Sequence, residues 1–156
     1  YRVKQILDIP VIVKLSPNVG GLYMPAQSAK EGGASAVSLV NTLIGAAFDI
    51  NNFKPKLGNV VGGLSGPAIK PVACAHIYKL CRENILPVIG MGGVFSWEDA
   101  IEFLIAGAKA VGLGTVNFVN YKAGIEIIES LGKYLVSKNI SDINHIIGRA
   151  HAKNRR

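Results

Sequence analysis

The sequence predicts an α/β fold, namely half of a (β/α)8 barrel, from three observations. A short apolar run, a turn and an amphipathic stretch follow one another four times along the 156 residues. The four runs do not alternate apolar with polar residues, so both faces of each strand should be buried, as in a parallel sheet wrapped by helices. A long insertion follows the second run, and insertions at the carboxyl ends of barrel strands are where active sites are built.

The four expected strands are rich in β-branched residues, which favour extended structure. They cover residues 11–13, 36–40, 87–90 and 110–113. Four βα units with right-handed crossovers could begin an open doubly wound sheet or form half of a barrel. The insertion, residues 43–63, is expected to be structureless. A loop of that length is uncommon in a compact domain unless it is functional, and this favours the barrel.

Helix signals separate the strands. Ser96 is expected to cap a helix, with Asp99 at the spacing of a capping box. Prolines at 67 and 71 predict the start of another helix, because proline is tolerated only in a first turn. A long helix over 121–138 and a short capped one from Ser141 complete the set. The expected helix ends are Glu31, Asn84 and Gly107.

Four such units leave a sheet with two unpaired parallel edges, which nothing in these residues covers. We therefore expect residues 1–156 to be the C-terminal half of one barrel domain, supplying strands 5–8. The N-terminal half would come from residues outside this sequence or from another chain.

Composition excludes several function classes. The formal charge is +7, from 17 Lys and Arg against 10 Asp and Glu. Part of the excess lies in the last residues (Arg149, Lys153, Arg155 and Arg156), and no basic stripe is interleaved with aromatic residues, so we expect no nucleic-acid partner. The apolar runs are too short to cross a bilayer and the first ten residues lack a signal-peptide core, so we expect a cytoplasmic protein.

Cysteine and histidine residues predict no metal site. Cys74 and Cys81 are seven residues apart on one expected helix, without a CxxC or Cys/His spacing. We interpret them as small buried apolar residues in a reducing compartment. His76, His145 and His151 lie on helices or near the tail, away from the strand ends, and are interpreted as non-catalytic.

Three glycine-rich turns, at 62–66, 90–93 and 112–115, are expected to follow successive strand ends. Glycine lets backbone N–H groups approach an anion, and each following helix offers its positive end. Any one of these turns is more simply explained as a tight turn. Three at the same end of a sheet favour a phosphate site, which barrels place after strands 7 and 8. None matches the dinucleotide pattern GxGxxG.

Polar residues also end the first two strands. Lys14 lies in an otherwise apolar run. Burial of an unpaired ammonium is costly, so a partner anion such as a phosphate, a carboxylate or a reduced flavin is implied. The alternative is an edge lysine that reaches water. Asn41 and Thr42 offer donors and acceptors to a planar ligand, or Asn41 could simply cap a turn.

Five segments together form a recognisable pattern: VKLSPN at 13–18, VNTLIG at 40–45, GGLSGPAIKPVA at 62–73, IGMGG at 89–93 and AVGLGT at 110–115. They resemble the class 1 dihydroorotate dehydrogenases, most closely the NAD-linked class 1B. The motif GGLSGPAIKP is specific, whereas VGLGT alone would be weak. The resemblance implies a (β/α)8 barrel that binds FMN at the carboxyl ends of its strands.

The resemblance also implies roles for individual residues. Lys14 would contact the pyrimidine edge of the flavin and stabilise the negative charge of the reduced ring. Val40 would line the flavin, and Asn41 and Thr42 would bind dihydroorotate or orotate. The residues implied to hold the ribityl phosphate are Gly66, Gly92, Gly93, Gly114 and Thr115.

The implied reaction is oxidation of dihydroorotate in pyrimidine (UMP) biosynthesis, with a hydride passing to flavin N5 and a base taking the neighbouring proton. The family's base is a cysteine on a loop of the first barrel half. Neither Cys74 nor Cys81 can be that residue, so we assign no catalytic residue to this chain. The implied partners are the N-terminal half of the barrel, a second copy in a homodimer, and a subunit that carries FAD and a 2Fe-2S cluster and delivers electrons to NAD.

Two alternatives stay open. A barrel of the dihydropyrimidine dehydrogenase type would use Lys14, Asn41 and Thr42 equally well. The residues of the motifs VNTLIGAAFDI and GGLSGPAIKP favour the orotate branch. A phosphate-binding half-barrel without redox chemistry is the other. The lack of an acid/base pair at the strand ends speaks mildly for it.

Overall fold

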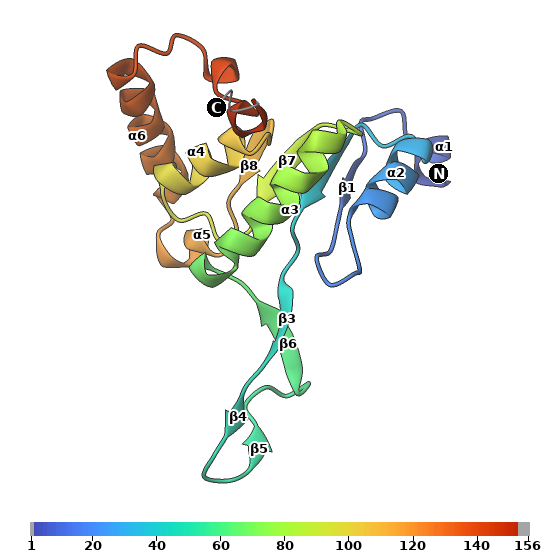
Figure 1. Cartoon of the computed structure of the whole chain (residues 1–156). Helices are drawn as coiled ribbons and strands as arrows, with labels where there is room; N and C mark the ends of the chain where they lie inside the picture. The colour runs from blue at the N-terminus through green and yellow to red at the C-terminus, as the bar shows by residue number, and fades with distance from the viewer. Residues whose placement is uncertain (1, 153–156) are drawn as a thin grey trace.

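Four parallel strands form the central sheet of the computed structural model, which describes residues 2–152 (Figure 1). They pair in the order β1-β2-β7-β8. All four strands expected from the sequence are present: β1 and β7 are shifted by one residue, and β2 and β8 are each one residue shorter than expected. Their bounds are Ile12–Lys14 for β1, Ala36–Leu39 for β2, Val88–Met91 for β7 and Ala110–Gly112 for β8.

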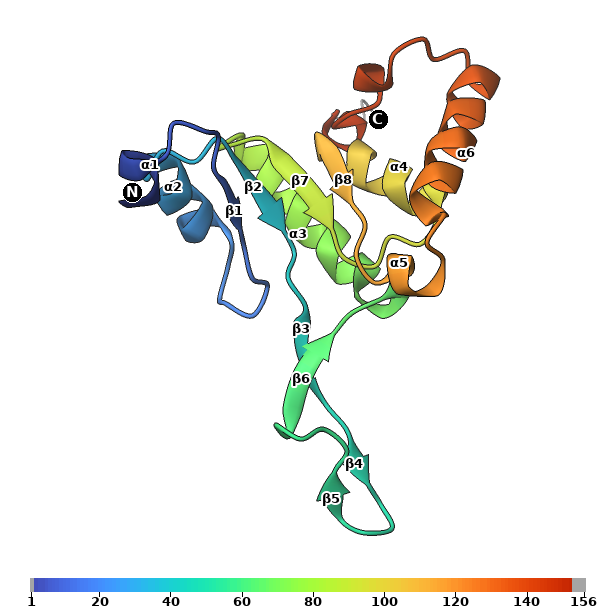
Figure 2. The same ribbon diagram turned by 180° about the vertical axis from the view of Figure 1, so that it is seen from behind.

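The helices that connect these strands lie on one face of the sheet. Seen from behind, β2 and β7 lie in front of α3 (Figure 2). Because the order of the strands in space follows their order in the chain, the sheet has no reversal point of the kind that defines a doubly wound fold. The α/β prediction is therefore confirmed. The connecting helices are α2 (Tyr23–Glu31), α3 (Lys70–Glu83) and α4 (Trp97–Ile105).

The core lies between the sheet and its helices. Val37, Leu39 and Val88 are buried on the helix-facing side, together with Ile77 of α3 and Phe103 of α4. On the opposite face of the sheet, residues of the two edge strands are exposed to solvent. Ile12 is 51% exposed, and Lys14 and Ala110 are also exposed. In this chain the second face of the sheet is therefore largely uncovered.

The helix signals largely match the structure. Ser96 and Asp99 form the expected capping box at the start of α4, and Asn84 ends α3 in a left-handed conformation. A 3₁₀ turn over Pro67–Ile69 (η1) precedes α3. The long helix α6 spans Ala123–Ser137 and packs on α4. After Ser141 the chain forms the 3₁₀ turns η2 (Ile143–His145) and η3 (Arg149–His151), and α1 (Arg2–Ile6) and α5 (Val116–Val119) were not predicted.

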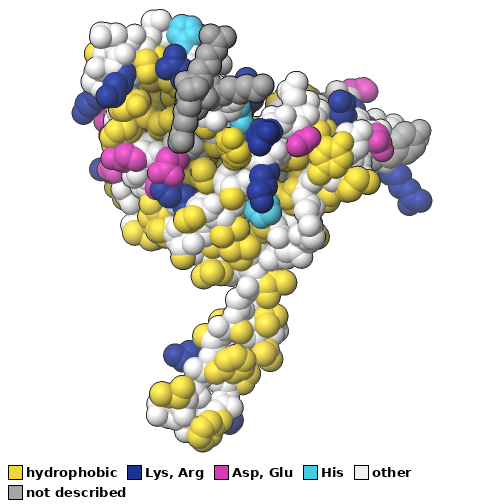
Figure 3. Space-filling view, viewed as in Figure 1, with side chains coloured by type: hydrophobic (Ala, Val, Ile, Leu, Met, Phe, Trp, Pro, Cys, Tyr) yellow, Lys and Arg dark blue, Asp and Glu magenta, His cyan; other side chains and the backbone are white. Residues whose placement is uncertain are grey.

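The insertion was wrongly predicted to be structureless. Residues 43–64, called the arm below, form two antiparallel ribbons that extend away from the sheet (Figures 1 and 3). The Gly, Asn and Pro signals do mark turns, but the residues between them pair across the arm. Phe53 at its tip is 89% exposed. The ribbons are β3 (Leu43–Ala46) with β6 (Val61–Leu64) and β4 (Phe48–Asp49) with β5 (Lys54–Pro55).

One glycine-rich segment was also misplaced. Gly62 and Gly63 lie inside β6 of the arm and do not form a turn after a strand of the parallel sheet.

Within residues 2–152, no helix is long and apolar enough to span a bilayer. The last three basic residues of the tail, Lys153, Arg155 and Arg156, lie outside the described residues.

Candidate functional site

A cavity of about 280 Å³ opens where the four parallel strands end. Every site residue expected from the sequence lines it. These residues come from the ends of β1, β2, β7 and β8 and from the segment that leads into η1. The nine are Lys14, Val40, Asn41, Thr42, Gly66, Gly92, Gly93, Gly114 and Thr115.

The glycine segments that line this cavity carry unused hydrogen-bond donors. Among residues 2–152, no oxygen accepts from the backbone N–H groups of Gly66, Gly92, Gly93, Gly114 or Thr115. Most backbone N–H groups in folded proteins are paired, so a cluster of free ones around a cavity suits an anionic ligand. The arrangement supplies the donor set that a phosphate group requires.

The turn after β7 specifically needs glycine. Gly92 and Gly93 have φ angles of 116° and 82°, a region that other residues rarely adopt. A Cβ atom on Gly93 would lie 2.7 Å from the backbone N of Lys70 and 2.8 Å from the carbonyl oxygen of Gly66. The turn therefore packs directly against the start of α3, which brings the Gly66 segment and the β7 turn together.

A side-chain contact joins the segment before η1 to the turn after β8. The hydroxyl of Thr115 donates to Oγ of Ser65 over 2.9 Å. Ser65 lines the cavity and was not among the residues expected there, although it lies in the segment GGLSG that drew attention to Gly66. The side chains of Ile69, Met91 and Leu113 add an apolar part to the lining.

Lys14 ends β1 at the rim of the cavity. Lys14 was expected to be buried and therefore to need a partner anion. Its side chain is instead exposed, so desolvation demands no such partner. Within the described residues, no carboxylate lies in ion-pair range of Lys14. Its ammonium group thus remains available to a ligand in the cavity.

The Asn41 side chain and the Thr42 backbone are engaged in hydrogen bonds. Asn41 Oδ1 accepts from the N–H of Thr42 over 2.9 Å, which is the turn-capping role that the sequence left open. The amide N–H₂ of Asn41 has no acceptor among residues 2–152, so it can still serve a ligand. The neighbouring Asn18 holds this corner in place: its Nδ2 donates to the Thr42 carbonyl oxygen over 2.8 Å, and its Oδ1 accepts from the N–H of Ile44.

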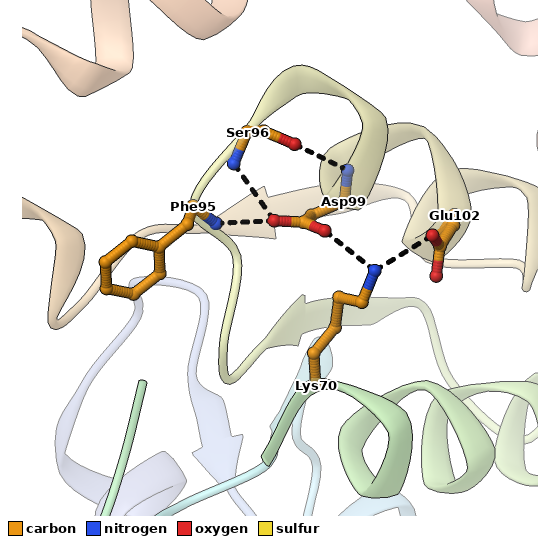
Figure 4. A network of polar contacts seen from close by, with 5 residues as sticks. All are labelled: Lys70, Phe95, Ser96, Asp99 and Glu102. Atoms are coloured by element: carbon orange, nitrogen blue, oxygen red, sulfur yellow. Dashed lines mark hydrogen bonds and ion pairs between the residues drawn. The ribbon is translucent and has the colours of Figure 1, made fainter. Parts of the chain in front are cut away.

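An ion-pair network lies just behind the cavity, between α3 and α4 (Figure 4). Lys70 Nζ lies 2.7 Å from Asp99 Oδ1 and 2.9 Å from Glu102 Oε1. Asp99 Oδ2 accepts from the N–H groups of Phe95 and Ser96 over 2.8 and 3.0 Å. From the sequence, Asp99 was expected only in the capping box, and Lys70 was not expected to have a role, because its partners are 29 and 32 residues away.

This network sets a pH prediction. Burial opposes ionisation of Asp99, but the hydrogen bonds from Lys70, Phe95 and Ser96 outweigh it and hold the pKa of Asp99 below its ordinary 3.8. The side-chain hydrogen bonds to Asp99 and Glu102 raise the pKa of Lys70 above its ordinary 10.5. The ion-pair network therefore stabilises the folded chain from about pH 5 to 10. This contribution is lost as acid protonates Asp99 or as strong base deprotonates Lys70.

Lys70→Met is accordingly expected to lower the free energy of unfolding by about 1–2 kcal/mol at pH 7, a range reduced for the partial exposure of the network. The same difference should be found at pH 5 and should shrink at pH 3. Denaturant unfolding of variant and wild type at the three pH values measures it. A difference that stays constant down to pH 3 would contradict the assignment to Asp99.

Comparison with known proteins identifies the family. The sequence model of the family described as dihydroorotate dehydrogenase matches residues 1–135. The chain belongs to the dihydroorotate dehydrogenase family. The resemblance of the five motifs is thereby confirmed.

Curated members of this family align along nearly the whole chain. A relative from Thermoanaerobacter sp. (strain X514), the catalytic subunit of dihydroorotate dehydrogenase B (NAD(+)), is 54% identical over 147 residues. Relatives of the same description from Alkaliphilus oremlandii and Desulforamulus reducens are 51% and 49% identical. The alignments cover 94–96% of this chain but 49% of each relative, so the chain spans about half the length of the curated relatives it matches.

The two cysteines of this dihydroorotate dehydrogenase family member lie on α3, away from the cavity. Burial raises the pKa of the Cys81 thiol to about 11, and burial also raises the pKa of Cys74. At neutral pH both are thiols, so neither is suited to act as a base or nucleophile. Both are half-buried rather than fully buried as expected.

Both thiols are therefore expected to react slowly with alkylating reagents at neutral pH in the native protein. Iodoacetamide should label Cys81 slowly at pH 7 in the native protein and rapidly after unfolding. Rapid labelling of Cys81 at pH 7 in the native protein would overturn this assignment.

Proposed function

We propose that this chain forms strands 5–8 of an FMN-binding (β/α)8 barrel that oxidises dihydroorotate to orotate in pyrimidine biosynthesis. The observation that carries the proposal is the cluster of five unpaired N–H groups, from Gly66, Gly92, Gly93, Gly114 and Thr115, around one cavity at the strand ends. Membership of the dihydroorotate dehydrogenase family supports it independently.

Two features of the sheet support a half-barrel. The four strands follow one another in chain order with their helices on one face. The edge strands β1 and β8 and much of the second face are uncovered, whereas parallel sheets are normally buried on both faces. Four further βα units would close the sheet and cover that face. The assembly of this chain with those units is called the complete barrel below.

The cavity fits FMN in the distribution of its polar groups. Four of the five N–H donors follow β7 and β8, and Lys14 lies at the end of β1, two or three strands away across the sheet. Strands are spaced by about 4.8 Å, so these groups suit the two ends of a ligand roughly 10–14 Å long. Apolar Val40 and Met91 lie between them, where a planar ring could pack.

FMN supplies the hydride acceptor when it is bound. The residues of this chain would hold and orient it: the glycine N–H groups would bind the phosphate, and Lys14 would place a positive charge beside the ring. The free amide N–H₂ of Asn41, with Thr42, would orient dihydroorotate over the same cavity. The proton would be taken by a base outside this chain.

The proposed partners follow from the same assignment. The relatives are described as catalytic subunits of an NAD(+)-linked enzyme, and we propose that this chain likewise works with an electron-transfer subunit that carries FAD and a 2Fe-2S cluster. We also propose that the complete barrel forms a homodimer.

The decisive experiment purifies the complete barrel and measures its flavin and its substrates. We expect bound FMN, released on denaturation, and reduction of that flavin by dihydroorotate but not by dihydrouracil. Flavin reduction by dihydrouracil alone would favour the dihydropyrimidine branch. A barrel that binds inorganic phosphate but no flavin would favour the phosphate-binding alternative.

A further inference from the structure

The residue that joins the two helices behind the cavity is Lys70, the first residue of α3. It is absent from the cavity lining, so its side chain does not reach a ligand there. Its ammonium group points between α3 and α4, where it meets Asp99 and Glu102 (Figure 4). Any effect of Lys70 on the cavity must therefore act through the residues that it holds.

The first link between Lys70 and the cavity is a contact of its backbone. A Cβ atom on Gly93 would lie 2.7 Å from the N atom and 2.9 Å from the Cα atom of Lys70. The same Cβ atom would lie 2.8 Å from the carbonyl oxygen of Gly66. The start of α3, Gly66 and Gly93 are thus in close contact, and two of the three contribute free N–H groups to the cavity.

The second link runs through the side chain. Asp99 uses one carboxylate oxygen to bind Lys70 and the other to accept from the N–H groups of Phe95 and Ser96. Those N–H groups end the loop over residues 92–96, called the β7–α4 loop below. Lys70 therefore contacts the β7–α4 loop at its beginning through its backbone and fixes it at its end through Asp99.

The two acidic partners of Lys70 differ in burial, and this difference decides which of them can transmit an effect of Lys70 to the cavity. The side chain of Asp99 is 15% exposed, whereas that of Glu102 is 50% exposed. The Glu102 side chain hydrogen-bonds Lys70 but makes no hydrogen bond to residues 92–96 of the β7–α4 loop. Exposed ion pairs contribute little, so Asp99 should carry the effect and Glu102 should be nearly dispensable.

Lys70 also balances charge near the proposed anion site. Asp99 accepts from N–H groups two and three residues after Gly93, so its negative charge lies on the same loop as free N–H groups of the cavity and would repel a phosphate bound there. The ammonium group of Lys70 neutralises it at 2.7 Å. Loss of Lys70 would loosen the β7–α4 loop and leave an uncompensated carboxylate behind it, and both changes act against an anion.

We propose that Lys70, acting through Asp99, is a positioning residue for the phosphate end of the cofactor site. It sets the separation of the free N–H groups of Gly66 from those of Gly92 and Gly93. Small displacements matter because hydrogen bonds to an anion weaken steeply with distance and angle. This inference rests on the proposed function, since it assumes that the anion is the phosphate of FMN.

The test compares FMN with riboflavin, which has the same ring but no phosphate. Dissociation constants of both are measured by fluorescence titration of the flavin-free complete barrel. Lys70→Met is expected to weaken FMN binding by about 10-fold or more, the loss expected for a charge-assisted hydrogen bond, and to change riboflavin binding by less than about 2-fold. Lys70→Arg should restore much of the preference for FMN.

Glu102→Gln is the matched control, because it removes a carboxylate from the same ammonium group without touching the β7–α4 loop. Its FMN affinity should stay within about 2-fold of wild type. If Lys70→Met does not fold, Lys70→Gln carries the same expectation, since it also removes the ammonium charge and leaves Asp99 uncompensated.

The outcomes separate the two proposals. Equal weakening of FMN and riboflavin by Lys70→Met, or an unchanged ratio of the two, would show that Lys70 has only a structural role. A wild-type barrel that does not prefer FMN over riboflavin would instead overturn the proposed function, whatever the variants do.

Discussion

Gly93→Ala is expected to lower the free energy of unfolding of the complete barrel by about 2–5 kcal/mol and to abolish measurable FMN binding. The first cost is conformational, because a φ of 82° costs an L-residue about 1–2 kcal/mol. The second is steric, because the new methyl group would lie within 3 Å of three backbone atoms. Backbone cannot move aside as a flexible side chain can, and overpacking of this kind adds about 1–3 kcal/mol.

Gly132→Ala on α6 provides the matched control. A Cβ atom there would meet nothing within 4 Å and the backbone is helical, so the change should be neutral or stabilising by up to about 1 kcal/mol. Denaturant unfolding and flavin titration of both variants measure the difference. A Gly93→Ala variant as stable as Gly132→Ala, with normal FMN affinity, would refute the packing of the β7–α4 loop against α3.

Lys14→Met is expected to slow dihydroorotate oxidation by the complete barrel about 10²-fold while leaving its stability near wild type. Removal of a preorganised charge beside the reacting group typically costs a factor of this size. Because Lys14 is exposed and makes no ion pair within the described residues, the folded chain itself loses little. Pre-steady-state reduction of bound flavin by dihydroorotate measures the rate, and denaturant unfolding measures the stability.

Lys109→Met serves as the control, since Lys109 lies at the opposite end of the sheet, just before β8. Its oxidation rate should equal that of wild type. A Lys14→Met rate equal to that of Lys109→Met would remove Lys14 from the proposed site. It would also leave the sequence argument for this residue without support, because burial does not supply it.

Much of the fold was predictable because its signals are local. The apolar runs marked the four strands, and Ser96 with Asp99 marked the start of α4, since both depend on residues a few positions apart. The site was predictable for a related reason. In a parallel sheet all strands end at the same edge, so residues at successive strand ends, such as Lys14, Asn41 and Gly92, necessarily gather there.

The arm could not be predicted in the same way. Its strands pair across a turn-rich stretch, and β4 and β5 are each two residues long, too short to give a periodic pattern. Gly62 and Gly63 were assigned to a phosphate turn because their composition suits one. They pair instead with Gly45 and Ile44 in the arm, a choice made by backbone hydrogen bonds that residue types alone do not specify.

By itself, the sequence determined the parallel α/β order, the capping of α4 and the cavity residues at the ends of the parallel strands, because each follows from local pattern and from chain order, whereas Val40 was expected only from the family resemblance. Only the tertiary structure decided that Lys14 is exposed, that Ser65 reaches Thr115, and that Lys70 meets Asp99 across 29 residues of sequence. These features depend on how α3, α4 and the strand ends pack, and contacts between distant residues leave no periodic trace in a single sequence.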